Sequence, residues 1–237
     1  MKFTKVPKKV RKLIPVKYCG AVIVAAGNAS RMGGIDKVMA PLQGEPMILR
    51  TVRQFQNCDA VKEIVVVTRP DLIVPIMDLC HDFSKLKAVV VGGDSRDASV
   101  SLGLNTLSGK CKLVAVHDGV RPLVTEKLVA KMFEDAASVP ALIPVIPCVD
   151  TMKVLRTVKD EAGASSLQTI PGASVDRSLL FGAQTPQIFH SEILKAAYAL
   201  PYDTAFTDDA SVVDKYGKNL SYTMGERFNI KITTADD

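Results

Sequence analysis

The stretch GAVIVAAGNASRMGGIDKVMAP, residues 20–41, joins an apolar run to a loop with three glycines, one arginine and one lysine. The run has the length of a buried strand, and the loop follows it directly. A P-loop requires GxxxxGK[ST], and a dinucleotide-binding turn requires GxGxxG. Neither pattern is present, because Asn28 and Ala29 follow Gly27. The missing GxGxxG disfavours a nicotinamide dehydrogenase.

The loop is nevertheless suited to an anion. Glycine allows the backbone to approach a ligand closely, and successive amides can turn toward one negative group. Arg31 offers a bidentate phosphate donor and Lys37 a mobile point charge. An ordinary glycine-rich turn with solvated cations explains the spacing equally well.

Strand-length apolar runs alternate with helix-length amphipathic stretches from residue 19 to residue 147. Continuous Val, Ile and Ala runs indicate strands that are covered on both faces, and the alternation indicates a mostly parallel sheet. We therefore expect an α/β fold with a doubly wound, mostly parallel, Rossmann-like sheet. Ligands of such sheets bind beyond the carboxyl ends of the strands.

The pattern changes after Pro147. Residues 149–187 alternate shorter β-like pieces, VDTMKVLRTV and RSLLFGAQT, around a polar middle, and predict a protruding β-arm. A two-stranded ribbon is marginal alone, so we expect it to pack on another subunit. Helices are expected at SEILKAAYAL and DDASVVDKYG, and two short strands at LSYTMGE and FNIKIT. The predicted organisation is a basic extension (1–17) and one domain (18–237) that carries the arm.

Charge and cysteine content narrow the function classes. The net charge is +5, but residues 1–17 contain seven basic and no acidic side chains, so the remainder carries 5 − 7 = −2. The body is thus near neutral, which argues against nucleic-acid binding, and no apolar run reaches the roughly 20 residues of a membrane span. The five cysteines form no CxxC pair and predict reduced thiols in a cytoplasmic protein.

Several motifs together carry a family resemblance: the opening loop, GGDSRDASVSLGL, VHDGVRP, DTMK, VDR, QTPQIF, TDDAS and GERFNIKIT. The loop resembles that of sugar-nucleotide pyrophosphorylases and related nucleotidyltransferases. In order and spacing, the whole set resembles the 2-C-methyl-D-erythritol 4-phosphate cytidylyltransferases of the non-mevalonate isoprenoid pathway. The resemblance runs from about residue 20 to the end of the chain.

The resemblance implies a site for CTP. Its nucleotide-binding positions are Ala25, Ala26, Gly27, Gly93, Asp94, Ser99, Asp118 and Gly119. Arg31, Lys37 and Lys231 are the implied catalytic cations, and Asp118 is the implied ligand of Mg²⁺ or another divalent cation. From the residues alone, Asp94 and Ser95 are equally good helix N-caps, Arg121 an ion-pair partner of Asp118, and His117 a packed residue.

The resemblance also implies a site for the polyol phosphate, formed by Thr151, Arg177, Thr185, Thr207 and Arg121. Thr151 and Arg177 lie on the arm, which in the family crosses a homodimer to complete the neighbouring site. Without the family, Arg177 and Lys231 would be interpreted as surface cations. Ribitol-5-phosphate cytidylyltransferases share several of these motifs, and a non-catalytic nucleotide-binding protein on the same fold is a further alternative.

Two positions depart from the family pattern. Ala29 replaces a second glycine, and Asp36 replaces a proline. A carboxylate beside Lys37 is expected to weaken the positive potential of the loop.

Overall fold

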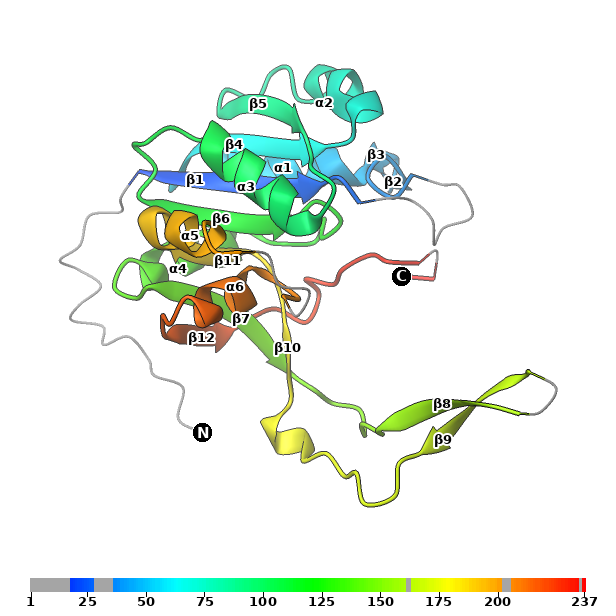
Figure 1. Cartoon of the computed structure of the whole chain (residues 1–237). Coiled ribbons are helices and arrows are strands. Elements are labelled where there is room, and N and C mark those ends of the chain that lie inside the picture. The colour runs from blue at the N-terminus through cyan, green and yellow to red at the C-terminus, as the bar shows by residue number, and fades with distance from the viewer. Residues whose placement is uncertain (1–17, 28–35, 161–162, 202–205, 235) are drawn as a thin grey trace.

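The computed structural model describes residues 18–27, 36–160, 163–201, 206–234 and 236–237 (Figure 1). Its strands are β1 (Cys19–Ala25), β2 (Pro41–Leu42), β3 (Glu45–Pro46), β4 (Val61–Thr68), β5 (Leu86–Val91), β6 (Leu113–Asp118), β7 (Ala141–Pro147), β8 (Leu155–Lys159), β9 (Ser165–Thr169), β10 (Phe181–Ala183), β11 (Gln187–His190) and β12 (Leu220–Met224). Its helices are α1 (Met47–Asn57), η1 (Pro70–Leu72), α2 (Ile73–Leu79), α3 (Arg96–Thr106), α4 (Glu126–Ala136), η2 (Arg177–Leu179), α5 (Ser191–Tyr198) and α6 (Asp209–Lys215).

One eight-stranded sheet forms the centre of the molecule. Its order is β10-β7-β11-β6-β1-β4-β5, and β12 pairs with β7. The pairs β1–β4, β1–β6, β4–β5 and β7–β12 are parallel, whereas β10 and β11 run antiparallel to their neighbours. The predicted α/β fold with a mostly parallel sheet is therefore confirmed.

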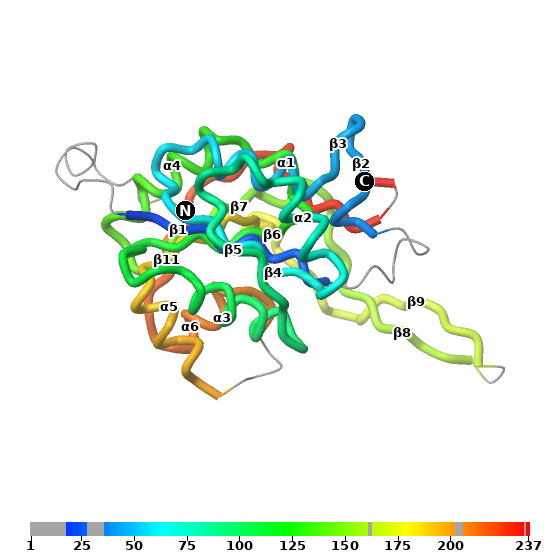
Figure 2. The backbone as a smooth tube through the Cα atoms, turned by 90° about the horizontal axis from the view of Figure 1, so that it is seen from above, coloured from blue at the N-terminus to red at the C-terminus, as the bar shows by residue number. Residues whose placement is uncertain are grey.

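Both faces of this sheet are covered by helices, which explains why its strands read as continuous apolar runs. On one face, Ala21 and Ile23 of β1 belong to a buried cluster with side chains of α1, α2 and α4. On the other face, Val22 belongs to a second cluster with side chains of α3, α5 and α6. Figure 2 shows the sheet between these two helix layers.

Three of the described α-helices begin with a side-chain cap. Ser95 accepts from the Ala98 amide (3.0 Å), Thr125 from the Leu128 amide (3.0 Å), and Asp208 from the Ser211 amide (2.9 Å). Each such cap typically contributes about 1 kcal/mol. Of the two candidates at the start of α3, Ser95 is thus the cap, which leaves the exposed Asp94 outside that role.

The arm differs in part from the prediction. Strands β8 and β9 form a separate antiparallel ribbon that projects from the body (Figures 1 and 2). The predicted second limb, RSLLFGAQT, is wrong: it forms η2 and then β10, which joins the main sheet beside β7. Its apolar Phe181 packs against the second core cluster, so burial draws this segment into the body.

Other elements also differ from expectation. The segment FNIKIT forms no strand in the described part of the chain; instead, the Ile232 amide donates to the Val120 carbonyl (2.9 Å). The short hairpin β2–β3 and strand β11 were not predicted. Among the described helices, none has the length and apolar character needed to cross a bilayer.

Candidate functional site

The loops that follow β1, β5 and β6 meet at the carboxyl end of the sheet. A side chain on Gly92 would come within 2.6 Å of Ala26 Cβ, and one on Gly119 within 3.0 Å of Ala25 Cβ. The Gly93 amide donates to Ser99 Oγ (3.1 Å), which fixes the loop after β5 to α3. The structure thus brings Ala25, Ala26, Gly93, Ser99 and Gly119 together, in contacts that leave little room for a side chain at positions 92 and 119.

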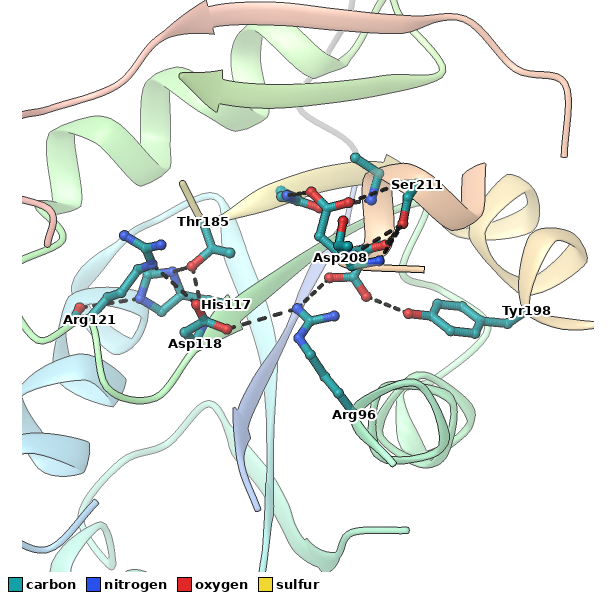
Figure 3. Close-up of polar contacts among 12 residues, drawn as sticks. Arg96, His117, Asp118, Arg121, Thr185, Tyr198, Asp208 and Ser211 are labelled. Carbon is teal, nitrogen blue, oxygen red and sulfur yellow. Dashed lines mark hydrogen bonds and ion pairs between the residues drawn. The ribbon is translucent and has the colours of Figure 1, made fainter. Parts of the chain in front are cut away.

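Asp118 ends β6 and is surrounded by cations (Figure 3). Its Oδ2 lies 3.2 Å from Arg121 Nε and 3.2 Å from Lys231 Nζ, and its Oδ1 lies 3.9 Å from Arg96 Nη2. Burial alone would raise the pKa of Asp118, but the charges of Lys231, Arg96 and Arg121 lower it below its ordinary value. Asp118 is therefore ionised at neutral pH.

His117 is fully buried beside this carboxylate. Its Nδ1 lies 3.0 Å from the Thr185 hydroxyl and its Nε2 lies 3.3 Å from the Arg121 carbonyl. Because a carbonyl can only accept, Nε2 carries the proton, and Nδ1 accepts from Thr185. Burial lowers the pKa of His117 to about 4, so the ring is neutral. The interpretation of His117 as a packed residue agrees with this geometry.

Thr185 lies just before β11 and contacts both of these residues at the end of the neighbouring strand β6. Its hydroxyl accepts from the Asp118 amide (3.1 Å), and the peptide bond to Pro186 is cis. Asn229 donates from Nδ2 to the Thr185 carbonyl (2.7 Å), and its own carbonyl accepts from Arg121 Nη1 (2.8 Å). These bonds fix the C-terminal segment, which includes Lys231, against the end of β6.

A buried ion pair beside Asp118 was missed from the sequence. Arg96 Nη2 donates to Asp209 Oδ2 (2.6 Å), and the Tyr198 hydroxyl donates to Asp209 Oδ1 (2.5 Å) (Figure 3). Asp209 is fully buried, and Arg96 Nη1 is buried without a hydrogen-bond partner among the described residues. Both residues lie inside quoted motifs, but 113 positions separate them, so no local signal joins them.

Lys37 lies at the same end of the sheet, where its Nζ donates to the carbonyl oxygen of Thr233 (3.2 Å). This bond brings the lysine of the first loop to the segment that contains Lys231. Arg31 falls outside the described residues. Asp36 forms an ion pair with Arg69. The positive charge of Arg69 therefore offsets the negative charge that was expected to weaken the positive potential of the loop.

The remaining predicted substrate residues lie in two separate places, one on the body and two on the arm. Thr207 is exposed and immediately precedes Asp208, the cap of α6. Thr151 and Arg177 belong to the projecting arm, where Arg177 Nη1 donates to the Val149 carbonyl (2.8 Å). Figure 1 shows that the arm starts at the carboxyl end of β7 and projects away from the rest of the molecule. One chain therefore does not bring these two residues to Asp118.

Known proteins resemble this chain over nearly all of its length. The family model for 2-C-methyl-D-erythritol 4-phosphate cytidylyltransferase matches residues 19–237. A relative of that name from Phocaeicola vulgatus is 39% identical over 220 residues, which cover 91% of this chain and 94% of the relative. Another from Symbiobacterium thermophilum is 35% identical over 219 residues, covering 91% and 88%.

Solved structures agree with the sequence relatives. The crystal structure of 4-diphosphocytidyl-2C-methyl-D-erythritol synthase from Anaerococcus prevotii has a TM-score of 0.77 at 26% identity, with 94% of this chain and 95% of that chain covered. The 2-C-methyl-D-erythritol 4-phosphate cytidylyltransferase of Thermus thermophilus has a TM-score of 0.70 at 27% identity, covering 92% and 94%. The chain belongs to the 2-C-methyl-D-erythritol 4-phosphate cytidylyltransferase family.

Proposed function

We propose that the protein transfers CMP from CTP to 2-C-methyl-D-erythritol 4-phosphate and releases pyrophosphate. A phosphate oxygen of the polyol phosphate attacks the α-phosphorus of CTP in line. The new O–P bond forms as the bond from the α-phosphorus to the bridging oxygen breaks, and pyrophosphate leaves with that electron pair. The attacking dianion is already ionised and needs no general base, which is consistent with a neutral, buried His117.

The observation that carries this proposal is the excess of cations around one buried carboxylate. Arg96, Arg121 and Lys231 surround Asp118, and Lys37 reaches the same segment through Thr233. Two polyanions must meet for the reaction to occur, so positioning and charge stabilisation supply most of the catalysis. We assign Lys37 and Arg31 to the triphosphate, and Lys231 to the attacking phosphate.

We assign the nucleotide to the joined loops and a divalent cation to Asp118. A single ionised carboxylate fits Mg²⁺, which commonly takes one or two carboxylates and completes its shell with substrate phosphates and water. When bound there, Mg²⁺ would neutralise charge on the triphosphate. Arg96 Nη1, a buried donor without a partner among the described residues, lies beside this position and suits an acceptor on a bound ligand.

The arm supports a homodimer in which each chain completes the site of the other. Leu167 and Leu179 are 68% and 70% exposed on the arm, which is an unfavourable arrangement for a ribbon in water. We propose that the arms of two copies pack together and that Thr151 and Arg177 reach the polyol phosphate of the partner. The free thiols, four of them buried, are consistent with a cytoplasmic enzyme.

Mixed dimers test the shared site. Lys37→Ala and Arg177→Ala proteins are each expected to be nearly inactive. If Arg177 acts in the partner's site, each heterodimer retains one intact site, so random mixing restores about one quarter of wild-type activity. If Arg177 acts within its own chain, mixing restores nothing, and the shared site is excluded.

The activity itself is tested by pyrophosphate release from CTP and Mg²⁺, with and without the acceptor. Release that depends on 2-C-methyl-D-erythritol 4-phosphate supports the proposal. Faster release with ribitol 5-phosphate would instead assign the protein to ribitol chemistry. Binding of CTP without release in the presence of either acceptor would indicate a non-catalytic nucleotide-binding protein.

A further inference from the structure

Arg69 contacts both residues that flank the glycine-rich loop. It follows β4 at the carboxyl end of the sheet, and its Nη1 donates to the Gly27 carbonyl (3.3 Å). Its Nη2 forms an ion pair with Asp36. Gly27 and Asp36 are the last described residue before the loop and the first after it. One guanidinium therefore joins the entry and the exit of residues 28–35.

A second carboxylate holds the guanidinium from the solvent side. Asp71 Oδ1 accepts from Arg69 Nε (3.2 Å), and Asp71 Oδ2 accepts from Nη2 (3.1 Å). The side chains of Arg69 and Asp36 are only 21% and 24% exposed, whereas that of Asp71 is 64% exposed. The Asp36 pair is therefore less screened by water than the Asp71 pair.

Asp36 passes this constraint to the next residue, Lys37. Its Oδ1 accepts from the Val38 amide (2.9 Å), and Val38 is buried at 3% exposure. The Ala40 amide donates to the Lys37 carbonyl (3.3 Å), which closes a turn around the lysine. The backbone of Lys37 is thus held between an anchored aspartate and a buried valine.

We propose that Arg69 is a positioning residue for Lys37, and that it acts through Asp36. It joins the ends of the loop and compensates a carboxylate that would otherwise repel the triphosphate. This role rests on the proposed CTP-dependent reaction. It belongs to this chain's own residues, since Asp36 replaces the proline expected at that position.

The kinetic test is a double-mutant cycle. Arg69→Met leaves Asp36 uncompensated, and kcat/KM for CTP is expected to fall about 10- to 100-fold, as for other small displacements of catalytic groups. The KM for the polyol phosphate stays within about twofold. Adding Asp36→Asn to Arg69→Met removes the uncompensated charge and keeps an oxygen that can accept from the Val38 amide. The kcat/KM for CTP of the double variant is therefore expected to be at least about threefold higher than that of Arg69→Met.

Asp71→Asn is the matched control, because Asp71 contacts the same guanidinium but not the loop. Its kcat/KM for CTP is expected to stay within about threefold of wild type. Unchanged CTP kinetics in Arg69→Met, an equal loss in Asp71→Asn, or additive losses in the double variant would each overturn the proposal.

Hydrogen exchange of the Val38 amide provides a readout that needs no catalysis. In the ligand-free protein, Arg69→Met is expected to speed this exchange about tenfold, and Asp71→Asn to leave it unchanged. If the wild-type protein is inactive but Arg69→Met still speeds the exchange of the Val38 amide, the proposed reaction is refuted and the structural role of Arg69 is retained. If the wild-type protein is active but Arg69→Met changes neither the exchange rate of the Val38 amide nor the kinetics with CTP, only the positioning role is refuted.

Discussion

Two acidic side chains mark opposite ends of the central sheet, and they are equally buried. The side chain of Asp118 at the carboxyl end is 10% exposed, and that of Glu63 at the amino end is 12% exposed. Asp118 and Asp209 share three cations, Arg96, Arg121 and Lys231. Glu63 has one cation, Lys87 (3.1 Å), and hydrogen bonds from the Ser108 amide (2.8 Å) and hydroxyl (2.5 Å).

The difference separates a binding site from a structural contact. The charges around Glu63 balance, and neutral donors satisfy its oxygens, so this end has no need of a ligand. The charges around Asp118 do not balance, and a buried donor on Arg96 has no partner among the described residues. A surplus of cations at the end of a parallel sheet is suited to an anionic ligand, and the same burial at the other end serves stability.

The largest effect is expected for Lys37 at the carboxyl end of the sheet, compared with Lys87 at the amino end. Lys37→Ala should lower kcat about 10²- to 10³-fold, as removal of one charge-stabilising donor does in other enzymes. Its melting temperature should hardly change, because the side chain of Lys37 makes a single hydrogen bond within the described residues, to the Thr233 carbonyl. Lys87→Ala, the matched control, should keep kcat within about twofold. Near-normal turnover by Lys37→Ala would remove this lysine from the mechanism.

An intermediate effect is expected at the amino end. Glu63→Gln should lower the free energy of unfolding by about 2 kcal/mol at pH 7, because hydrogen bonds to a charged group are lost. Catalysis should be unaffected. Urea unfolding gives the first quantity, and pyrophosphate release gives the second. A large fall in kcat with unchanged stability would show that the two ends are not functionally separate.

The remaining predictions are two pH dependences of stability. The pKa of His117 falls from 6.5 to about 4, mainly through burial. Burial would raise the pKa of Glu63, but hydrogen bonds from Ser108 and Lys87 lower it from 4.5 to about 2. In each interval the unfolded chain binds a proton that the folded chain does not, so stability falls as the pH is lowered. The carboxyl end should therefore weaken between pH 6.5 and 4, and the amino end between pH 4.5 and 2.

Two variants test whether His117 and Glu63 cause the loss of stability in these two pH intervals. His117→Gln should flatten the dependence of the urea midpoint on pH in the upper interval only, and Glu63→Gln in the lower interval only. If either substitution flattened both intervals, the ends of the sheet would be coupled in their titration, contrary to the comparison.

Much of the fold was predictable because burial leaves a local signature. The strand at residues 19–25 and helix α4 follow directly from their apolar patterns, with Leu128, Val129, Met132 and Phe133 on the buried face as expected. The limb at RSLLFGAQT was wrong because its alternation fits any strand, and only tertiary packing chooses β7 as its partner. FNIKIT likewise alternates, but its backbone groups bond to Val120 and Arg121 rather than to a strand.

The site was predictable where its residues lie at the ends of strands. Gly93, Asp118 and Gly119 follow apolar runs, and the sheet brings such positions together. The pairs Arg96–Asp209 and Arg69–Asp36 were not predictable, because each joins residues from different motifs and a charge does not reveal its partner. The roles proposed for Thr151 and Arg177 require a second chain, which no pattern within one chain can specify.

The arm leaves the body and returns to it at a single residue pair of the strands β7 and β10. Pro147, the last residue of β7, stands opposite Phe181, the first residue of β10. The 33 residues between them, 148–180, are therefore an insertion whose ends are only about 5 Å apart, the separation of paired strands. Such an insertion can lengthen, shorten or change in sequence without shifting the register of the body. Under the proposed function, acceptor recognition by the arm and nucleotide chemistry in the body can thus evolve as separate modules.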